Sequence, residues 1–158
     1  MRVVDALIRL PRVDARESYL LGFWRFVELL AANRYEDAVA GLLWPGGRRV
    51  DPNGFRQAIE GFFGGDEPWS VIIPNERLVA VINEAAEVEL PVEHAARACC
   101  DDPKFHGHGP GWMLCQIPVT NEPQRAKEDD VVLMGVAASF ILEAQEDAYV
   151  MGFEMFHA

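Results

Sequence analysis

The sequence predicts an α+β fold in which three N-terminal helices pack on a mainly antiparallel β-sheet. In the first third of the chain, apolar residues recur at intervals of three and four positions, as in amphipathic helices. In the last third, apolar and aromatic runs separated by short polar turns are typical of strands. The 158 residues fit one domain, and Val, Leu, Ile and Phe supply 45 of them, which excludes an intrinsically disordered chain.

The first helix is predicted at about 15–32. Asp14 and Glu17 have the spacing of a capping box, in which each side chain accepts a hydrogen bond from a free backbone N–H of the first turn. The apolar positions that then recur at helical spacing are Leu20, Phe23, Val27 and Leu30.

Two shorter helices are predicted to follow. Asn33 is the expected N-cap of the second helix, which the Pro-Gly-Gly segment at 45–47 stops. Asp51 followed by Pro52 predicts the start of the third helix, because proline at the first helical position loses no hydrogen bond. Two glycines at 64–65 end it.

The middle of the chain is less regular. Residues 69–73 predict a strand that Pro74 ends. Residues 76–90 fit an alternating strand and an amphipathic helix equally well, so both alternatives stay open. A short helix is expected at 91–102 and a glycine- and proline-rich loop at 103–111.

Three strands are predicted in the last third, at 112–119, 131–143 and 148–157, and the last two form a hairpin. Alternation gives the 131–143 strand two apolar faces, one with Val132, Met134, Val136, Ala138, Phe140 and Leu142 and the other with Val131, Leu133, Ala137 and Ile141. In the final strand it places Tyr149, Met151, Phe153 and Met155 opposite Val150, Glu154 and Phe156. Because the helices cover only one face, we expect a homodimer that covers the other.

The order of elements resembles the nuclear transport factor 2-like, or SnoaL-like, superfamily of cone-shaped, cystatin-like α+β domains. The resemblance depends on the helix around 23–30, the Asn-Arg-Tyr-Glu-Asp-Ala segment at 33–38, the helix at 51–63 and the paired runs at 131–143 and 148–157. It implies one domain over 1–158, with a curved sheet and an apolar pocket between helices and sheet. The ending at 152–157 also resembles that of small bacterial proteins of this fold, some of which are similar to immunity proteins of toxin systems.

If the resemblance extends to function, the chain is a small-molecule enzyme or ligand carrier. The residues that we expect in its pocket are Tyr19, Trp24, Trp112 and Glu154. Glu154 is the candidate catalytic carboxylate, because an apolar environment raises the pKa of a carboxyl group toward the range useful for acid–base chemistry. Strict alternation places Glu154 and His157 on opposite faces, so they are not expected to form a dyad. Ser139 lacks the glycines of a nucleophile elbow.

The formal charge of −11 is concentrated in residues 57–158, which carry 18 acidic and 5 basic side chains. An acidic chain repels phosphate backbones, so direct nucleic-acid binding is disfavoured, whereas a basic protein partner is attracted. Glu128, Asp129 and Asp130 are the expected contacts for such a partner. The longest apolar run, near 131–142, is shorter than a membrane span needs, and no membrane association is expected.

Three cysteines do not form an even disulfide framework, so we expect a reducing, cytoplasmic location. His106 and His108 are the candidate metal ligands beside Cys99 and Cys100, but the spacing of a structural zinc site is absent and no metal or cofactor is expected. The main hypothesis is therefore a non-catalytic module that binds a protein partner, in the manner of an immunity protein. The alternative is the SnoaL-like enzyme or carrier.

Overall fold

The computed structural model describes residues 6–13, 15–91 and 110–157. It confirms the α+β class: helices pack on a strongly curled antiparallel sheet. The helices are α1 (Arg16–Ala31), α2 (Tyr35–Ala40), α3 (Pro52–Glu60) and α4 (Glu76–Ala85). The strands are β1 (Arg9–Pro11), β2 (Ser70–Val71), β3 (Glu87–Glu89), β4 (Gly111–Thr120), β5 (Met134–Gln145) and β6 (Ala148–His157).

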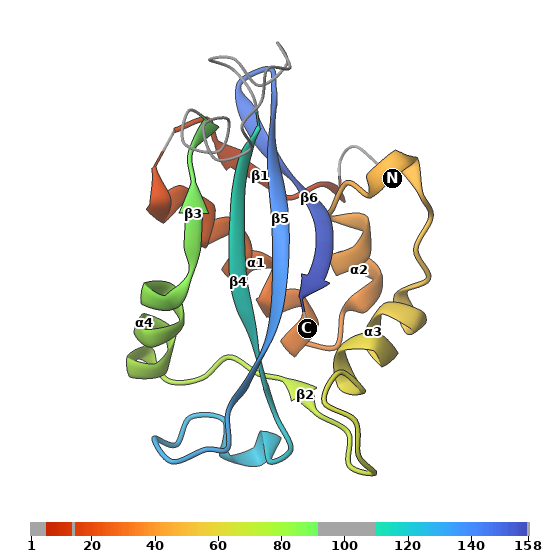
Figure 1. Cartoon of the computed structure of the whole chain (residues 1–158), viewed down its shortest axis with the longest axis vertical. Helices are drawn as coiled ribbons and strands as arrows, with labels where there is room; N and C mark the ends of the chain where they lie inside the picture. Colours follow the sequence, from red (N-terminus) through yellow and green to blue (C-terminus); the bar gives the residue numbers. More distant parts are fainter. Residues whose placement is uncertain (1–5, 14, 92–109, 158) are drawn as a thin grey trace.

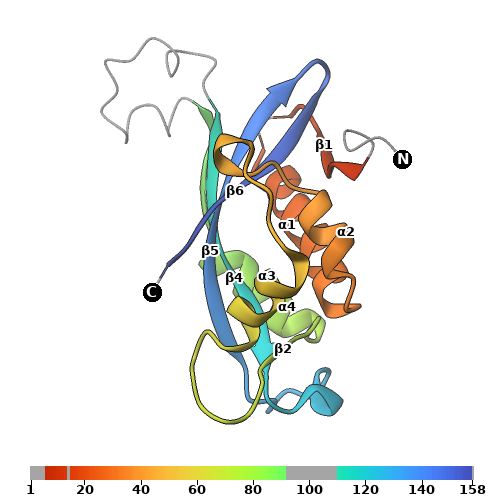
Figure 2. The same ribbon diagram turned by 90° about the vertical axis from the view of Figure 1, so that its right-hand side faces the viewer.

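The sheet has the order β1-β6-β5-β4-β2, and β3 pairs with the other end of β4 (Figure 1). The predicted terminal hairpin is the β5–β6 pair, whose turn contains Glu146 with a positive φ of 54°. Leu43 extends the edge of β6 beyond β1, because its backbone N–H donates to Met151 and its carbonyl accepts from Phe153. Helices α1 and α2 lie on one face of the sheet, which we call the inner face, and the opposite face is the outer face (Figure 2).

The helix starts follow local capping chemistry. The carboxylate of Asp51 accepts hydrogen bonds from the backbone N–H groups of Asn53 and Gly54, which confirms the predicted cap of α3. The cap of α1 is Ala15, without a side-chain hydrogen bond, and not the predicted Asp14, which lies outside the described residues. Asn33 is also not a cap: it has φ 60° and ends α1, a left-handed conformation that asparagine tolerates.

The ambiguous segment 76–90 contains both alternatives. Asn75 accepts a hydrogen bond from Leu78 N–H at 3.0 Å and so caps α4, and the chain turns extended at Ala86 before β3 pairs with β4. The strand predicted at 69–73 is reduced to β2. The helix predicted at 91–102 lies outside the described residues beyond position 91.

The inner face carries the core. From β5, Val136, Ala138, Phe140 and Leu142 are fully buried, as alternation predicts. The Phe140 ring lies 5.6 Å from Phe26 and 6.2 Å from Phe23 of α1, both centroid to centroid. Aromatic side chains of α1 and the sheet therefore fill this part of the space between helices and sheet. Alternation predicts Val132 and Met134 on the same face, but they lie before and at the first residue of β5, and both are exposed.

A β-bulge changes the pattern predicted for β6. Ser139 pairs with Met155, but Phe140 pairs with Phe153, so Glu154 is an extra residue in β6. The predicted faces are therefore wrong beyond this point. Met155 is 50 % exposed on the outer face, whereas Phe156 turns inward and its ring lies 5.0 Å from that of Phe153.

Candidate functional site

The four residues expected in one pocket lie on two sides of the sheet. Tyr19 is fully buried under the inner face, and its hydroxyl lies against the backbone of Gly111. Trp24 of α1 donates from Nε1 to Oδ1 of Asn83 at 2.6 Å. Trp112 belongs to the outer face, where its Nε1 donates to Glu154 Oε1 at 3.0 Å. The structure therefore brings Trp112 and Glu154 together and places Tyr19 and Trp24 elsewhere.

Glu154 belongs to a hydrogen-bonded group on the outer face. Ser139 Oγ lies 2.7 Å from Glu154 Oε1 and 2.8 Å from His157 Nε2. The prediction that Glu154 and His157 point to opposite faces is wrong, because the bulge adds one residue between Phe153 and Met155 and so brings both side chains to Ser139.

The order of these groups determines their chemistry. An ionised carboxylate has only acceptors and a serine hydroxyl has one proton, so Ser139 donates to Glu154 and accepts from the Nε2–H tautomer of His157. A serine nucleophile needs the reverse arrangement, in which histidine accepts the serine proton and a carboxylate orients the histidine. Ser139 is also fully buried. This geometry fixes the position of the Glu154 carboxylate and does not activate the serine.

Cross-strand pairing shows what surrounds Glu154. One row across β3, β4 and β5 consists of Glu87, Leu114 and Ser139. A second row across the same strands consists of Glu89, Trp112 and Ile141. Directly paired residues of an antiparallel sheet point to the same face. Within residues 6–13, 15–91 and 110–157, the acidic residues that this pairing places on the outer face are Glu87, Glu89, Glu143 and Glu154. Arg9 pairs with Val150, which pairs with Glu143, so Arg9 lies on the same face.

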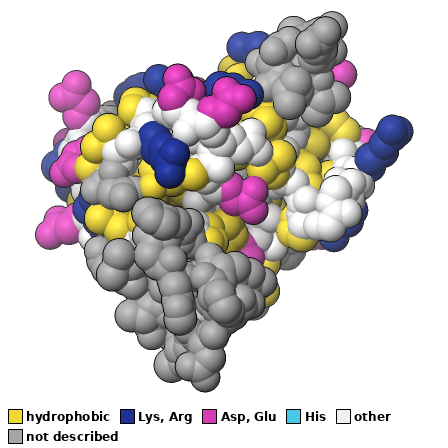
Figure 3. Space-filling view, turned by 90° about the horizontal axis from the view of Figure 1, so that it is seen from above, with side chains coloured by type: hydrophobic (Ala, Val, Ile, Leu, Met, Phe, Trp, Pro, Cys, Tyr) yellow, Lys and Arg dark blue, Asp and Glu magenta, His cyan; other side chains and the backbone are white. Residues whose placement is uncertain are grey.

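A cleft of about 500 Å³ opens on the same face beside the turn at 45–47. Its walls include Trp44 and Ile141, and both Glu143 and Glu154 line it. Among the residues that the structure describes, no lysine or arginine lines this cleft. Around the top of the molecule, acidic and basic side chains both occur with hydrophobic surface between them (Figure 3).

The predicted partner contacts Glu128, Asp129 and Asp130 are exposed, but each is in an ion pair. Arg125 pairs with Glu128 and lies 2.7 Å from Asp130, and these hydrogen bonds raise the pKa of Arg125 above its ordinary value. Arg77 of α4 lies 3.2 Å from Asp129. The cluster therefore presents less net negative charge than its sequence suggests.

His106, His108, Cys99 and Cys100 lie outside the described residues. Among the residues that the structure does describe, no group of three or more His, Cys, Asp or Glu side chains is placed to hold a metal ion. Cys115 is a free thiol, and burial raises its pKa to about 12. In the described ranges, every helix is too short or too polar to cross a bilayer.

Comparisons of the chain with protein-family models, with curated proteins and with solved structures found no match.

Proposed function

We propose that the protein is a binding module that recognises a basic protein partner through the outer face of its sheet. The observation that carries this proposal is the composition of that face. In the described part of the chain, four glutamates accompany one arginine there, and apolar side chains lie between them. Helices α1 and α2 lie on the opposite, inner face (Figure 2), and Glu87, Glu143 and Glu154 are exposed.

The apolar and acidic groups have different roles in such an interface. Met155 is 50 % exposed, and Leu114 and Ile141 are partly exposed, so a partner that covers them gains hydrophobic stabilisation. The glutamates attract lysine and arginine side chains over a distance and so raise the association rate. Trp112 and Ser139 hold the Glu154 carboxylate in place, which reduces the entropy lost when a cation binds it.

Segment 152–157 resembles the ending of small bacterial proteins, some of which are similar to immunity proteins, and this makes a basic toxin the first partner class to test. The sequence points to Glu128, Asp129 and Asp130, but intramolecular ion pairs occupy these carboxylates. Partner recognition is therefore assigned mainly to the glutamates of the outer face.

The same face is the one expected to form a homodimer. Two copies in face-to-face contact would bring Glu87 and Glu143 of one copy near acidic residues of the other, and like charges oppose this association. Salt screens repulsion and attraction alike, so it strengthens a homodimer and weakens a complex with a basic partner. Light scattering over a concentration series at low and high salt therefore distinguishes the two assemblies.

The alternative, a SnoaL-like enzyme or carrier, needs a polar-tipped cavity between the helices and the sheet. Phe23, Phe26 and Phe140 occupy the centre of that space. Glu154, the candidate catalytic carboxylate, lies on the opposite face. The described side chains therefore support the binding module better than catalysis inside the cone.

The test compares two variants with a purified basic protein that the wild-type chain has captured. Glu87→Lys combined with Glu143→Lys reverses two exposed charges of the outer face, and we expect it to weaken the complex at least about tenfold. The comparison variant neutralises Glu128, Asp129 and Asp130 to the amides, and we expect a change below about threefold because these charges are already paired. Equal effects of the two variants, or an affinity insensitive to salt, would contradict the proposal.

A further inference from the structure

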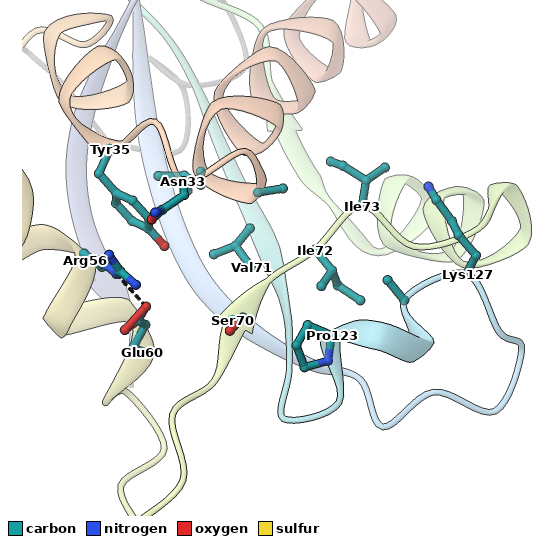
Figure 4. Close-up of a pocket in the computed structure, with 13 residues that line it drawn as sticks. Asn33, Tyr35, Arg56, Glu60, Ser70, Val71, Ile72, Ile73, Pro123 and Lys127 are labelled. Carbon is teal, nitrogen blue, oxygen red and sulfur yellow. Dashed lines mark hydrogen bonds and ion pairs between the residues drawn. The ribbon is translucent and has the colours of Figure 1, made fainter.

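A second cleft, of about 450 Å³, lies beside β2, the strand that Figure 1 draws near the bottom of the molecule. It is bounded by the C-terminal end of α1, by α3, by the extended segment 70–73 and by the turn at 123–127 (Figure 4). Leu30 and Val71 are almost fully buried beneath it, and Ile73 and Pro123 form further apolar walls. This cleft is separate from the outer face and from the proposed partner surface.

One end of the cleft is polar and contains Tyr35. The residue is 7 % exposed, and its hydroxyl points into the cleft (Figure 4). Within the described part of the chain, this hydroxyl makes no hydrogen bond, and it stays accessible from the cleft. The guanidinium of Arg56 lies 5.8 Å from the centre of the Tyr35 ring and holds the ring in place. Tyr35 therefore offers an oriented donor to whatever enters the cleft.

The charges around Tyr35 balance. Arg56 Nε lies 2.7 Å from Glu60 Oε1, an ion pair one helical turn apart in α3. Burial raises the pKa of Tyr35 to about 12, so its hydroxyl keeps its proton at neutral pH. A charged ligand group placed here would have no free counter-charge. At the other end, the Lys127 ammonium donates to the Pro74 carbonyl at 3.3 Å, away from Tyr35 (Figure 4).

We propose that this cleft binds a small uncharged molecule with an apolar body and a carbonyl group at one end. The carbonyl oxygen accepts the proton of the Tyr35 hydroxyl, and the apolar body covers Val71 and Ile73. The balanced Arg56–Glu60 pair selects against carboxylates and ammonium groups, because burying an unpaired charge costs far more than burying a neutral carbonyl that is hydrogen-bonded. This is a ligand function additional to the proposed protein binding.

The test uses three probes of nearly the same shape and different charge: acetophenone, benzoate and benzamidine. Each is titrated into the isotope-labelled full chain, and the amide resonances are followed by NMR. We expect acetophenone to shift the signals of residues 33–35 and 70–73. We expect benzoate and benzamidine to bind at least about tenfold more weakly, since each buries an unpaired charge.

Two variants connect this binding to the cleft. Tyr35→Phe removes only the hydroxyl, and we expect acetophenone affinity to fall about 3- to 10-fold, the net value of one hydrogen bond. The matched control Tyr149→Phe removes a hydroxyl from the core beside β1 and leaves the affinity unchanged. Ala31→Leu fills the cleft from the end of α1 and abolishes binding. The proposal is overturned if no probe binds, if a charged probe binds as tightly as acetophenone, or if Tyr35→Phe has no effect.

Discussion

Replacing Phe140 with alanine tests whether the inner face of the sheet is a filled core or a ligand cavity. Phe140 is fully buried on β5 and has edge-to-face contacts with Phe23, Phe26 and Phe153 at centroid distances of 6.2, 5.6 and 5.9 Å. Phe140→Ala removes the ring and leaves a cavity whose walls are held by the helix and the sheet. Such changes lower the free energy of unfolding by about 3–5 kcal/mol. For a domain of this size, the melting temperature should fall by about 6–20 °C.

The assay is thermal and urea unfolding followed by circular dichroism. Phe63→Ala is the matched control, because Phe63 is 36 % exposed and its ring contacts within the described residues are with Phe62 and Trp69 at the periphery of the core. We expect the control to lose well under half as much stability. Benzene should partly restore the melting temperature of Phe140→Ala and not change that of the wild type, since an apolar cavity of this kind binds benzene. If Phe140→Ala lowers the free energy of unfolding by less than about 1 kcal/mol, the core is not filled at this position and the inner face is open to a ligand.

Three further predictions concern single positions. Gly111→Ala should destabilise the fold by about 1–3 kcal/mol, because an added Cβ would lie 2.1 Å from the Tyr19 hydroxyl. Gly152→Ala should be tolerated, because its added Cβ would meet no atom closer than 3.5 Å. Urea unfolding compares the stabilities of the two variants. The buried Cys115 thiol should resist alkylation in the native protein and react after unfolding. Peptide mapping by mass spectrometry measures the alkylated fraction. Fast alkylation of the native protein would mean that the site opens to solvent. Burial raises the pKa of both Cys115 and Tyr35 to about 12, so the unfolded chain loses these protons at lower pH than the folded chain does. The free energy of unfolding should therefore be steady below about pH 8 and fall between about pH 9 and 12. Urea unfolding measures this free energy at each pH, and a flat alkaline profile would contradict the prediction.

The local patterns that predicted the fold correctly are those with a single physical cause. Alternation on β5 predicted the buried face because Val136 and Phe140 belong to a regular strand with one helix-covered side. The Asp51-Pro52 start of α3 followed from the hydrogen bonds that a first turn needs. Segment 76–90 remained ambiguous because a short amphipathic helix followed directly by an edge strand satisfies neither pattern throughout, although Asn75 offered a capping signal.

The candidate sites depended on contacts that no local pattern contains. Trp112 and Glu154 meet across 42 positions of sequence, and they share a face with His157 only because of the bulge. Charge counting along the chain identified the acidic run near 128–130, but it took no account of Arg77, which α4 brings to this run from more than 50 positions away. The cleft at Tyr35 collects its walls from four separate segments, so only the three-dimensional structure shows it.

The pairing of β1 with β6 has a consequence for how the protein is made. Arg9–Pro11 lie opposite residues 148–150, so the first described strand has no partner until these residues, almost 140 positions later, have been synthesised. Leu43 likewise waits for residues 151–153. Long-range strand pairing of this kind must overcome a large loss of chain entropy before its contacts are gained. We therefore expect the N-terminal helices to leave the ribosome with their apolar sides uncovered and the sheet to close only after residues 148–157 have emerged, which makes the nascent chain a natural client for chaperones.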